Sequence, residues 1–189
     1  MNDVHVIKAA LLGAGTVGSG VYDILQWQKD EMPKKLGAVV ELKKILVRDT
    51  KKQREGMDSS LFTDNWKEIL EDPEIEIIIE VMGGIEPAKT YITEALHAGK
   101  HVVTANKDLL AEHGREVLDA AAEHGCDLMF EAAVAGGIPI IRPLKQCLAA
   151  NHLTEVMGIV NGTTNYILTK MTKDHMEFSD ALALATKLG

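Results

Sequence analysis

Residues 13–18 read Gly-Ala-Gly-Thr-Val-Gly, a G-x-G-x-x-G pattern set between an apolar run and an amphipathic segment. Six of the seven residues from 6 to 12 are apolar, as expected for a parallel strand that is buried on both faces. After the glycines, apolar residues recur at helical spacing, at Val17, Val21, Ile24 and Leu25. A strand, a tight turn and a helix in this order constrain the chain to open with a βαβ unit.

The three glycines of this pattern have separate physical roles in dinucleotide-binding units. Gly13 permits the tight turn, Gly15 lets the backbone approach a pyrophosphate, and Gly18 lets the helix pack closely against the strand. The N-terminus of the following helix then faces the phosphates. The pattern therefore predicts a bound dinucleotide. A plain strand, turn and helix stays open as the alternative, because glycine is common in turns.

Composition and charge limit the classes of protein to which this chain can belong. The 189 residues are 46% hydrophobic and 25% charged, which is ordinary for a globular chain with one good core. A formal charge of −8, with no stripe of Lys or Arg, argues against a nucleic-acid partner. No apolar run reaches membrane-spanning length, and the N-terminus lacks a signal-peptide pattern. We therefore expect a cytoplasmic protein without a membrane partner.

Strand and helix patterns alternate along most of the chain. The alternation predicts an α/β fold, a Rossmann-like doubly wound parallel sheet, within a first domain at 1–150. A new strand at 154–160 marks a second domain at 151–189, the beginning of an α+β substrate and dimerisation domain. The strands expected after the first one lie at 39–47, 75–81, 101–105 and 128–133.

The end of the second expected strand bears on the choice of cofactor. Units that prefer NAD place an acid there for the ribose hydroxyls, whereas an arginine accommodates the 2′-phosphate of NADP. This strand ends Val-Arg-Asp at 47–49 and offers both residue types. The interpretation favoured here is NADP with Arg48 as the phosphate partner. A solvated Arg48 beside Asp49, with NAD as cofactor, is the alternative.

Two further stretches each admit two interpretations. Gly83 and Gly84 follow the strand at 75–81 and either allow a ligand to approach the backbone or form a simple turn. The polar residues at 161–165 either cap a helix, through Thr163 or Thr164, or line the nicotinamide end of the cofactor.

Three longer motifs join the glycine loop in a combination that is more specific than any one of them. They are Thr-Ala-Asn-Lys at 104–107, Glu-Ala-Ala-Val-Ala-Gly-Gly-Ile-Pro at 131–139, and Gly-Ile-Val-Asn-Gly-Thr-Thr-Asn-Tyr at 158–166. With these motifs the chain resembles the homoserine dehydrogenase family over essentially its whole length. The resemblance implies NAD(P)-dependent, reversible reduction of L-aspartate 4-semialdehyde to L-homoserine, on the biosynthetic route to threonine, methionine and isoleucine.

The resemblance also implies roles for individual residues. It adds Thr16 and Val17 to the glycines at the pyrophosphate, and places Thr104 and Lys107 near the nicotinamide and the substrate. Lys107 is the catalytic candidate, because an ammonium group can donate hydrogen bonds to the carbonyl oxygen that gains negative charge during hydride transfer. A solvated lysine is the alternative. Gly189 corresponds to a residue that contacts the cofactor.

A monovalent cation, in most members sodium, is a further property implied by the resemblance. Its oxygen ligands correspond here to Glu131, Val134, Gly136 and Ile138, and most of them are backbone carbonyl groups. Glycines suit such a loop, and hard cations prefer oxygen ligands. A Gly-Gly turn before a helix is the alternative.

The chain departs from the family pattern in ending at residue 189. The main acid–base and substrate residues of the family follow a Gly-Tyr-Ala-Glu segment that is absent here. We therefore expect a cofactor-binding N-terminal portion that is inactive alone, within a full-length enzyme that forms homodimers and acts on a small molecule. A dehydrogenase of another small amino-acid substrate and a non-catalytic nucleotide-binding module are the alternatives.

Overall fold

The computed structural model describes residues 5–159 and 161–188. The chain divides into two compact units, 1–136 and 137–189. The sequence analysis places the boundary later, at 150/151. The structure divides the chain earlier because residues beyond 136 add no strand to the sheet of the first unit among those described. Pro143–Cys147, for example, forms a single π-helical turn.

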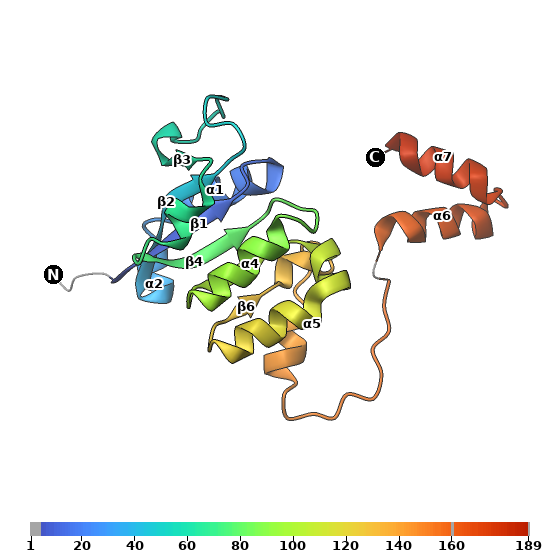
Figure 1. The fold of residues 1–189 in the computed structure, drawn as a ribbon. Coiled ribbons are helices and arrows are strands. Elements are labelled where there is room, and N and C mark those ends of the chain that lie inside the picture. Colours follow the sequence, from blue (N-terminus) through green and yellow to red (C-terminus); the bar gives the residue numbers. More distant parts are fainter. Residues whose placement is uncertain (1–4, 160, 189) are drawn as a thin grey trace. The chain divides into compact units, whose positions relative to one another are not determined.

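A six-stranded sheet forms the centre of the first unit, and all its neighbouring strands are parallel (Figure 1). The strand order is β3-β2-β1-β4-β5-β6, which is that of a doubly wound dinucleotide-binding fold. The predicted α/β, Rossmann-like fold is confirmed. In chain order the strands are β1 His5–Leu12, β2 Ala38–Leu46, β3 Phe62–Thr63, β4 Ile75–Glu80, β5 His101–Thr104 and β6 Leu128–Met129.

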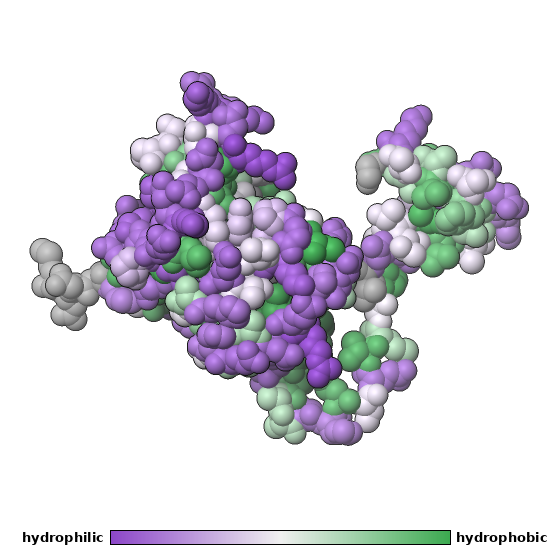
Figure 2. Space-filling view, viewed as in Figure 1, coloured by the Kyte–Doolittle hydropathy of each residue, from purple (hydrophilic) through white to green (hydrophobic). Residues whose placement is uncertain are grey.

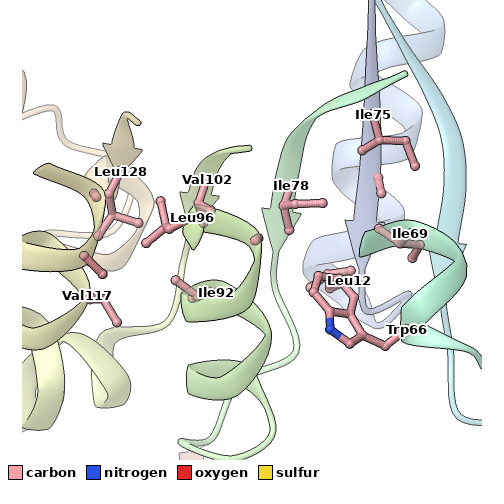
Figure 3. Packing of buried hydrophobic residues seen from close by; sticks show 14 of the residues in the cluster. Leu12, Trp66, Ile69, Ile75, Ile78, Ile92, Leu96, Val102, Val117 and Leu128 are labelled. Atoms are coloured by element: carbon pink, nitrogen blue, oxygen red, sulfur yellow. The ribbon is translucent and has the colours of Figure 1, made fainter. Parts of the chain in front are cut away.

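Helices cover both faces of this sheet. The apolar side chains of α3, α4 and α5 pack on one face, in the cluster that includes Trp66, Ile92 and Val117 (Figure 3). Tyr22 of α1 packs on the other face against Leu11 and Ile45. The helices of this unit are α1 Thr16–Trp27, α2 Met32–Leu36, α3 Trp66–Leu70, α4 Ala88–His97 and α5 Lys107–Glu123.

Two predicted strands differ from the structure. The strand expected at 128–133 ends at Met129, and Glu131–Ala133 form a 3₁₀ turn instead. The strand expected at 154–160 is wrong for its described part, because residues 152–159 contain no helix or strand. Apolar residues alone do not make a strand, since the backbone must find hydrogen-bonding partners on a neighbouring strand. Val160 lies outside the described residues.

The second unit contains α6 Gly162–Lys173 and α7 Phe178–Leu188. The helix cap predicted in the polar stretch is present, but Asn161 supplies it. Its side-chain oxygen accepts a 2.7 Å hydrogen bond from the N–H of Thr164. Apolar side chains gather on the visible surface of α6 and α7 (Figure 2). The exposed apolar residues of these two helices include Leu168, Phe178 and Leu182. No helix in the described parts of either unit has the length and apolar character needed to cross a membrane.

Asp72 ties the loop before β4 to β2. Its carboxylate lies 2.6 Å from the ammonium of Lys43 and accepts a 2.9 Å hydrogen bond from the N–H of Glu74. The hydrogen bond from Lys43 is the main cause that holds the pKa of Asp72 below its ordinary value, against the opposing effect of burial. A carboxyl group with a lowered pKa in the folded state stabilises the fold only while it is ionised.

An Asp72→Asn variant should therefore lose part of the acid sensitivity of the fold. The contribution of Asp72 is fully present above its unfolded pKa of about 4 and is lost as the pH falls through the lower folded pKa. The free energy of unfolding in urea, measured from neutral pH down to about pH 3, should fall less steeply in the variant. Asp64→Asn is the control, because Asp64 is exposed. Equal slopes for the unchanged chain and the Asp72 variant would contradict this account.

Candidate functional site

The sheet reverses its winding between β1 and β4, at the centre of the strand order. The chain leaves β1 for a helix on one face and leaves β4 for a helix on the opposite face. The connections after two such strands diverge, so a crevice forms outside their carboxyl ends, where ligands bind in open α/β sheets. Both glycine-rich segments predicted to approach a ligand, 13–18 and 83–84, lie at this edge.

The first glycine segment packs tightly against the residues that follow β4 and against itself. Gly13 has a φ of 105°, a left-handed conformation, and a Cβ atom there would lie 3.2 Å from the carbonyl oxygen of Val81. A Cβ atom on Gly18 would lie only 2.1 Å from the carbonyl oxygen of Gly13. These two positions therefore require glycine for the turn and for the close packing of α1, as the pattern predicts.

Gly15 differs from its two partners, because a Cβ atom there would meet nothing within 4 Å. It is the N-cap residue of α1, and as a glycine it has no side chain to accept a hydrogen bond from the first turn of this helix. Thr16 and Val17 of that turn are exposed, and no acidic residue occupies it. The helix therefore presents backbone N–H groups and the positive end of its dipole to the crevice, as an anion site requires.

Arg48 lies just beyond the carboxyl end of β2 and is exposed. Among the described residues, no hydrogen bond or ion pair engages its guanidinium group. Asp49 instead has a local role, because its carboxylate accepts hydrogen bonds from the N–H groups of Lys51 and Lys52, at 2.8 and 3.2 Å. The loop thus fixes the acid in its own turn and leaves the arginine available to a ligand.

The ends of β4 and β5 are joined by buried polar side chains. Glu80, Thr104 and Asn106 are all at most 3% exposed, and Thr104 has no exposed surface at all. The Thr104 hydroxyl donates a 2.7 Å hydrogen bond to the Glu80 carboxylate and accepts one of 3.0 Å from the Asn106 N–H. Asn106 caps α5, and Lys107, the first residue of that helix, is exposed beside the crevice edge.

Comparison with known proteins agrees with this geometry. The family model described as "Homoserine dehydrogenase, NAD binding domain" matches residues 13–131, which include the glycine loop and the carboxyl ends of β2, β4 and β5. A second model, "Homoserine dehydrogenase", matches residues 139–189. The chain belongs to the homoserine dehydrogenase family. The resemblance drawn from its motifs is thereby confirmed.

Relatives in this family cover nearly all of the chain. A homoserine dehydrogenase of Bacillus subtilis is 48% identical over 98% of the chain, and one of Synechocystis is 45% identical over 97%. A homoserine dehydrogenase structure from Thiobacillus denitrificans superimposes with a TM-score of 0.86 at 42% identity over 97% of the chain. The chain spans only 43%, 42% and 43% of the lengths of these three proteins.

The segment that the homoserine dehydrogenase resemblance assigns to a cation runs through the boundary between the units. Glu131, Val134 and Gly136 lie in the first unit, and Ile138 lies in the second. Ala135 and Gly136 have φ values of 58° and 62°, so the backbone takes two consecutive left-handed steps there. Gly189, the remaining predicted cofactor contact, lies outside the described residues.

Two residues of the candidate site, Glu80 and Asn106, are not predicted as site residues from the sequence. Glu80 lies within the strand expected at 75–81 and Asn106 within the motif at 104–107, and neither pattern assigns the residue a role in the site. A carboxylate inside a dense run of β-branched residues is a detectable signal, because ionised groups are rarely fully buried. The partner of such a group, Thr104, cannot be identified without the pairing of β4 with β5.

Proposed function

We propose that this chain binds NADP(H) at the carboxyl edge of its sheet and serves the homoserine dehydrogenase reaction. That reaction is the reversible reduction of L-aspartate 4-semialdehyde to L-homoserine, in the biosynthesis of threonine, methionine and isoleucine. The observation that carries the proposal is the contrast within the glycine loop. Gly13 and Gly18 are packed against protein atoms, whereas Gly15 faces open space before an uncapped, exposed helix N-terminus.

A calorimetric titration of the 189-residue chain with NADPH, and separately with NADH, tests the cofactor part of this proposal. We expect saturable binding of both, with NADPH bound about tenfold more tightly, equivalent to about 1.4 kcal/mol. Equal affinities would shift the specificity argument from Arg48 to Asp49. Absence of binding by either cofactor would contradict the proposal.

The preference for NADP rests on the different engagement of Arg48 and Asp49. The Asp49 carboxylate is held by two N–H groups of its own loop, whereas the Arg48 guanidinium is exposed. Guanidinium groups bind phosphates through paired, charge-assisted hydrogen bonds. A 2′-phosphate beside the end of β2 would therefore find a ready partner.

Arg48→Ala should weaken NADPH binding about tenfold, because one charge-assisted contact to the 2′-phosphate is lost. NADH has no such phosphate, so its dissociation constant should change by less than about twofold. The ratio of the two constants, measured by calorimetry, is the readout. Arg115→Ala, at a highly exposed position on α5, is the control and should leave the ratio unchanged. Parallel loss of both affinities would assign Arg48 a structural role instead.

Lys107 is the proposed donor to the carbonyl oxygen of the substrate. Its place as the first residue of α5 supports this role, since both its ammonium group and the helix N-terminus favour developing negative charge. Asn106 fixes the start of the helix by accepting a 3.2 Å hydrogen bond from the Leu109 N–H.

The 189-residue chain alone should bind cofactor and show no turnover. The family resemblance places the principal acid–base residue in a segment that this sequence does not contain. The measurement is the loss of NADPH absorbance in the presence of aspartate 4-semialdehyde. A rate of about 1 per second or more, typical of enzymes, would contradict this division and assign the proton transfer to Lys107.

A monovalent cation, sodium above all, is proposed beside this edge. The carboxylate of Glu131 and the carbonyl groups of Val134 and Gly136 would hold it, and hard cations prefer oxygen ligands of this kind. The left-handed φ values at Ala135 and Gly136 support a loop whose carbonyl groups converge. The assignment of Ile138 as a fourth ligand rests on the family resemblance alone. When bound, the ion would supply positive charge that fixes the loop.

The remaining proposals concern the oligomeric state, the cellular location and the substrate class of the full-length protein. A homodimer of the full-length enzyme, a cytoplasmic location and a small-molecule substrate are consistent with the family. The exposed apolar residues of α6 and α7 agree with a surface that is covered by further protein. Light scattering on a chain extended to the length of its relatives would test the dimer.

A further inference from the structure

Glu80 is a fully buried carboxylate at the carboxyl end of β4, and its two oxygen atoms have different partners. One oxygen accepts a 2.8 Å hydrogen bond from the N–H of Met82, in the loop that follows the same strand. The other accepts the 2.7 Å hydrogen bond from the Thr104 hydroxyl, at the end of the neighbouring strand β5. No ion pair to Glu80 exists among residues 5–159 and 161–188. The group is therefore held by neutral donors alone.

The hydrogen bonds continue from β5 back to the β4 loop. Thr104 accepts from the Asn106 N–H, and the Asn106 side-chain amide donates a 2.6 Å hydrogen bond to the carbonyl oxygen of Gly84. The circuit thus begins and ends in the segment 82–84. It joins that segment to the loop that leads into α5 and Lys107.

These hydrogen bonds order segment 82–84, whose two glycines make few other contacts. Gly83 and Gly84 are exposed, have φ values of 72° and 74°, and would have no neighbour within 4 Å of a Cβ atom. Glycines in such a loop lose much conformational entropy when they are ordered. Burial of a carboxylate is costly unless every lone pair direction is well used. An apolar residue would pack at the end of β4 without that cost. The presence of a carboxylate at position 80 is therefore accounted for by the hydrogen bonds through which it orders segment 82–84.

We propose that Glu80, Thr104 and Asn106 form a clamp that positions segment 82–84 and the start of α5 for the nicotinamide half of the cofactor. The inference rests on the proposed cofactor function. Glu80 and Thr104 have no exposed surface, so both act as positioning residues. Thr104, which the resemblance places near the nicotinamide, would thus serve the cofactor through its hydrogen bonds to Glu80 and Asn106 rather than by direct contact.

The position of the clamp in the sheet assigns it to one half of the dinucleotide. Doubly wound folds bind one mononucleotide on each side of the point where the strand order reverses. Arg48 follows β2, on the side proposed for the adenosine half, whereas the clamp joins β4 to β5 on the other side. Loss of the clamp should therefore weaken contacts of the nicotinamide half alone.

Thr104→Val is the central variant, because it keeps the shape of the side chain and removes the hydroxyl group. It leaves one Glu80 oxygen without its donor and the Asn106 N–H without its acceptor. Thr104→Ser restores the hydroxyl group and should restore the clamp. Glu80→Gln is an independent second variant, since an amide oxygen can still accept from Met82 while the amide nitrogen cannot accept from the Thr104 hydroxyl.

The chain contains a matched control at Thr63, which ends β3. Its hydroxyl donates a 2.9 Å hydrogen bond to Glu68 and accepts one of 3.1 Å from the Asn65 N–H, and the residue is 5% exposed. Thr63→Val thus removes the same pair of hydrogen bonds at another strand end. Any general effect of replacing a buried threonine should appear in both valine variants.

Two measurements on the 189-residue chain test the clamp. In the ligand-free chain, hydrogen exchange of the Asn106 N–H, which loses its acceptor, should accelerate about tenfold or more in Thr104→Val, but not in Thr63→Val or in Glu80→Gln, which keeps the Thr104 hydroxyl. NADPH should bind about tenfold more weakly to the two clamp variants and give less fluorescence enhancement of its nicotinamide ring. Adenosine 2′,5′-bisphosphate, a probe of the other half, should bind within about twofold of its original affinity.

The outcomes separate the clamp from the function on which it rests. Unchanged exchange and unchanged NADPH affinity in Thr104→Val would overturn the clamp. Equal weakening of NADPH and of adenosine 2′,5′-bisphosphate would also overturn it, because the role would then be general to the fold. An unchanged chain that binds neither probe would overturn the proposed function itself.

Discussion

Gly18→Ala should abolish NADPH binding and lower the free energy of unfolding by about 3 kcal/mol, near the upper end of the cost of overpacking. The added Cβ atom would lie 2.1 Å from the carbonyl oxygen of Gly13 and 2.9 Å from its carbonyl carbon. Both are backbone atoms of the turn, so no side chain can rotate to make room. The helix must move away from the strand, and the N-terminus of α1 then leaves the phosphate position.

Two other glycines provide controls for this prediction. Gly20 lies in the same helix with nothing within 4 Å of a Cβ atom, so Gly20→Ala should raise stability by about 0.5–1 kcal/mol and leave binding intact. Gly15→Ala should fold normally yet bind NADPH poorly, because its methyl group would occupy the space proposed for the pyrophosphate. Urea unfolding and calorimetry measure the two effects. Normal NADPH affinity in Gly18→Ala would contradict the proposed cradle.

Lys100→Met should destabilise the first unit by about 2–4 kcal/mol, from two lost charge-assisted hydrogen bonds in a buried position. Lys100 is 5% exposed, and its ammonium group donates to the carbonyl oxygens of Asp72 and Ile75, at 2.7 and 2.8 Å. Burial lowers the pKa of this lysine. Methionine fills most of the same volume, so the loss reports the hydrogen bonds more than the packing.

The control for this change is Lys67→Met, on the exposed side of α3. It should alter the free energy of unfolding by less than about 0.5 kcal/mol, as most surface substitutions do. NADPH affinity should stay the same in Lys100→Met, because the residue precedes β5 and lies at the end of the sheet opposite the crevice. A Lys100 variant as stable as the control would show that the two carbonyl groups find other partners.

The sequence predicts the elements of the first unit well because their signals are local. A buried strand, a glycine turn and an amphipathic helix are each recognisable within about ten residues, and βαβ alternation dictates the parallel sheet. Arg48 becomes a candidate for the same reason, since it lies just beyond the end of β2, whereas the role of Lys107 comes from the family resemblance. The positions of residues at the ends of parallel strands follow from the topology alone.

The rest depends on contacts between residues that are distant in the chain. The Glu80 and Thr104 side chains meet only because β4 pairs with β5, and neither side chain reveals its partner in the sequence. The strand predicted at 154–160 was wrong in its described part because apolar alternation does not supply a neighbouring strand. At α6 the sequence located the cap but not the residue that forms it, since Asn161 and the nearby threonines all carry side-chain oxygens that can accept from helix N–H groups.

The packing of the glycine loop on β4 has a consequence for how the protein is made. β1 can pair with β2 as soon as residue 46 has been synthesised, yet Gly13 rests on Val81 and Met82, and the Val81 N–H donates to the Leu12 carbonyl group. A nascent chain that has not yet reached residue 82 therefore has the glycine turn but lacks the residues on which the turn packs. The proposed nucleotide site is therefore expected to form only after β4 has been synthesised and has paired with β1.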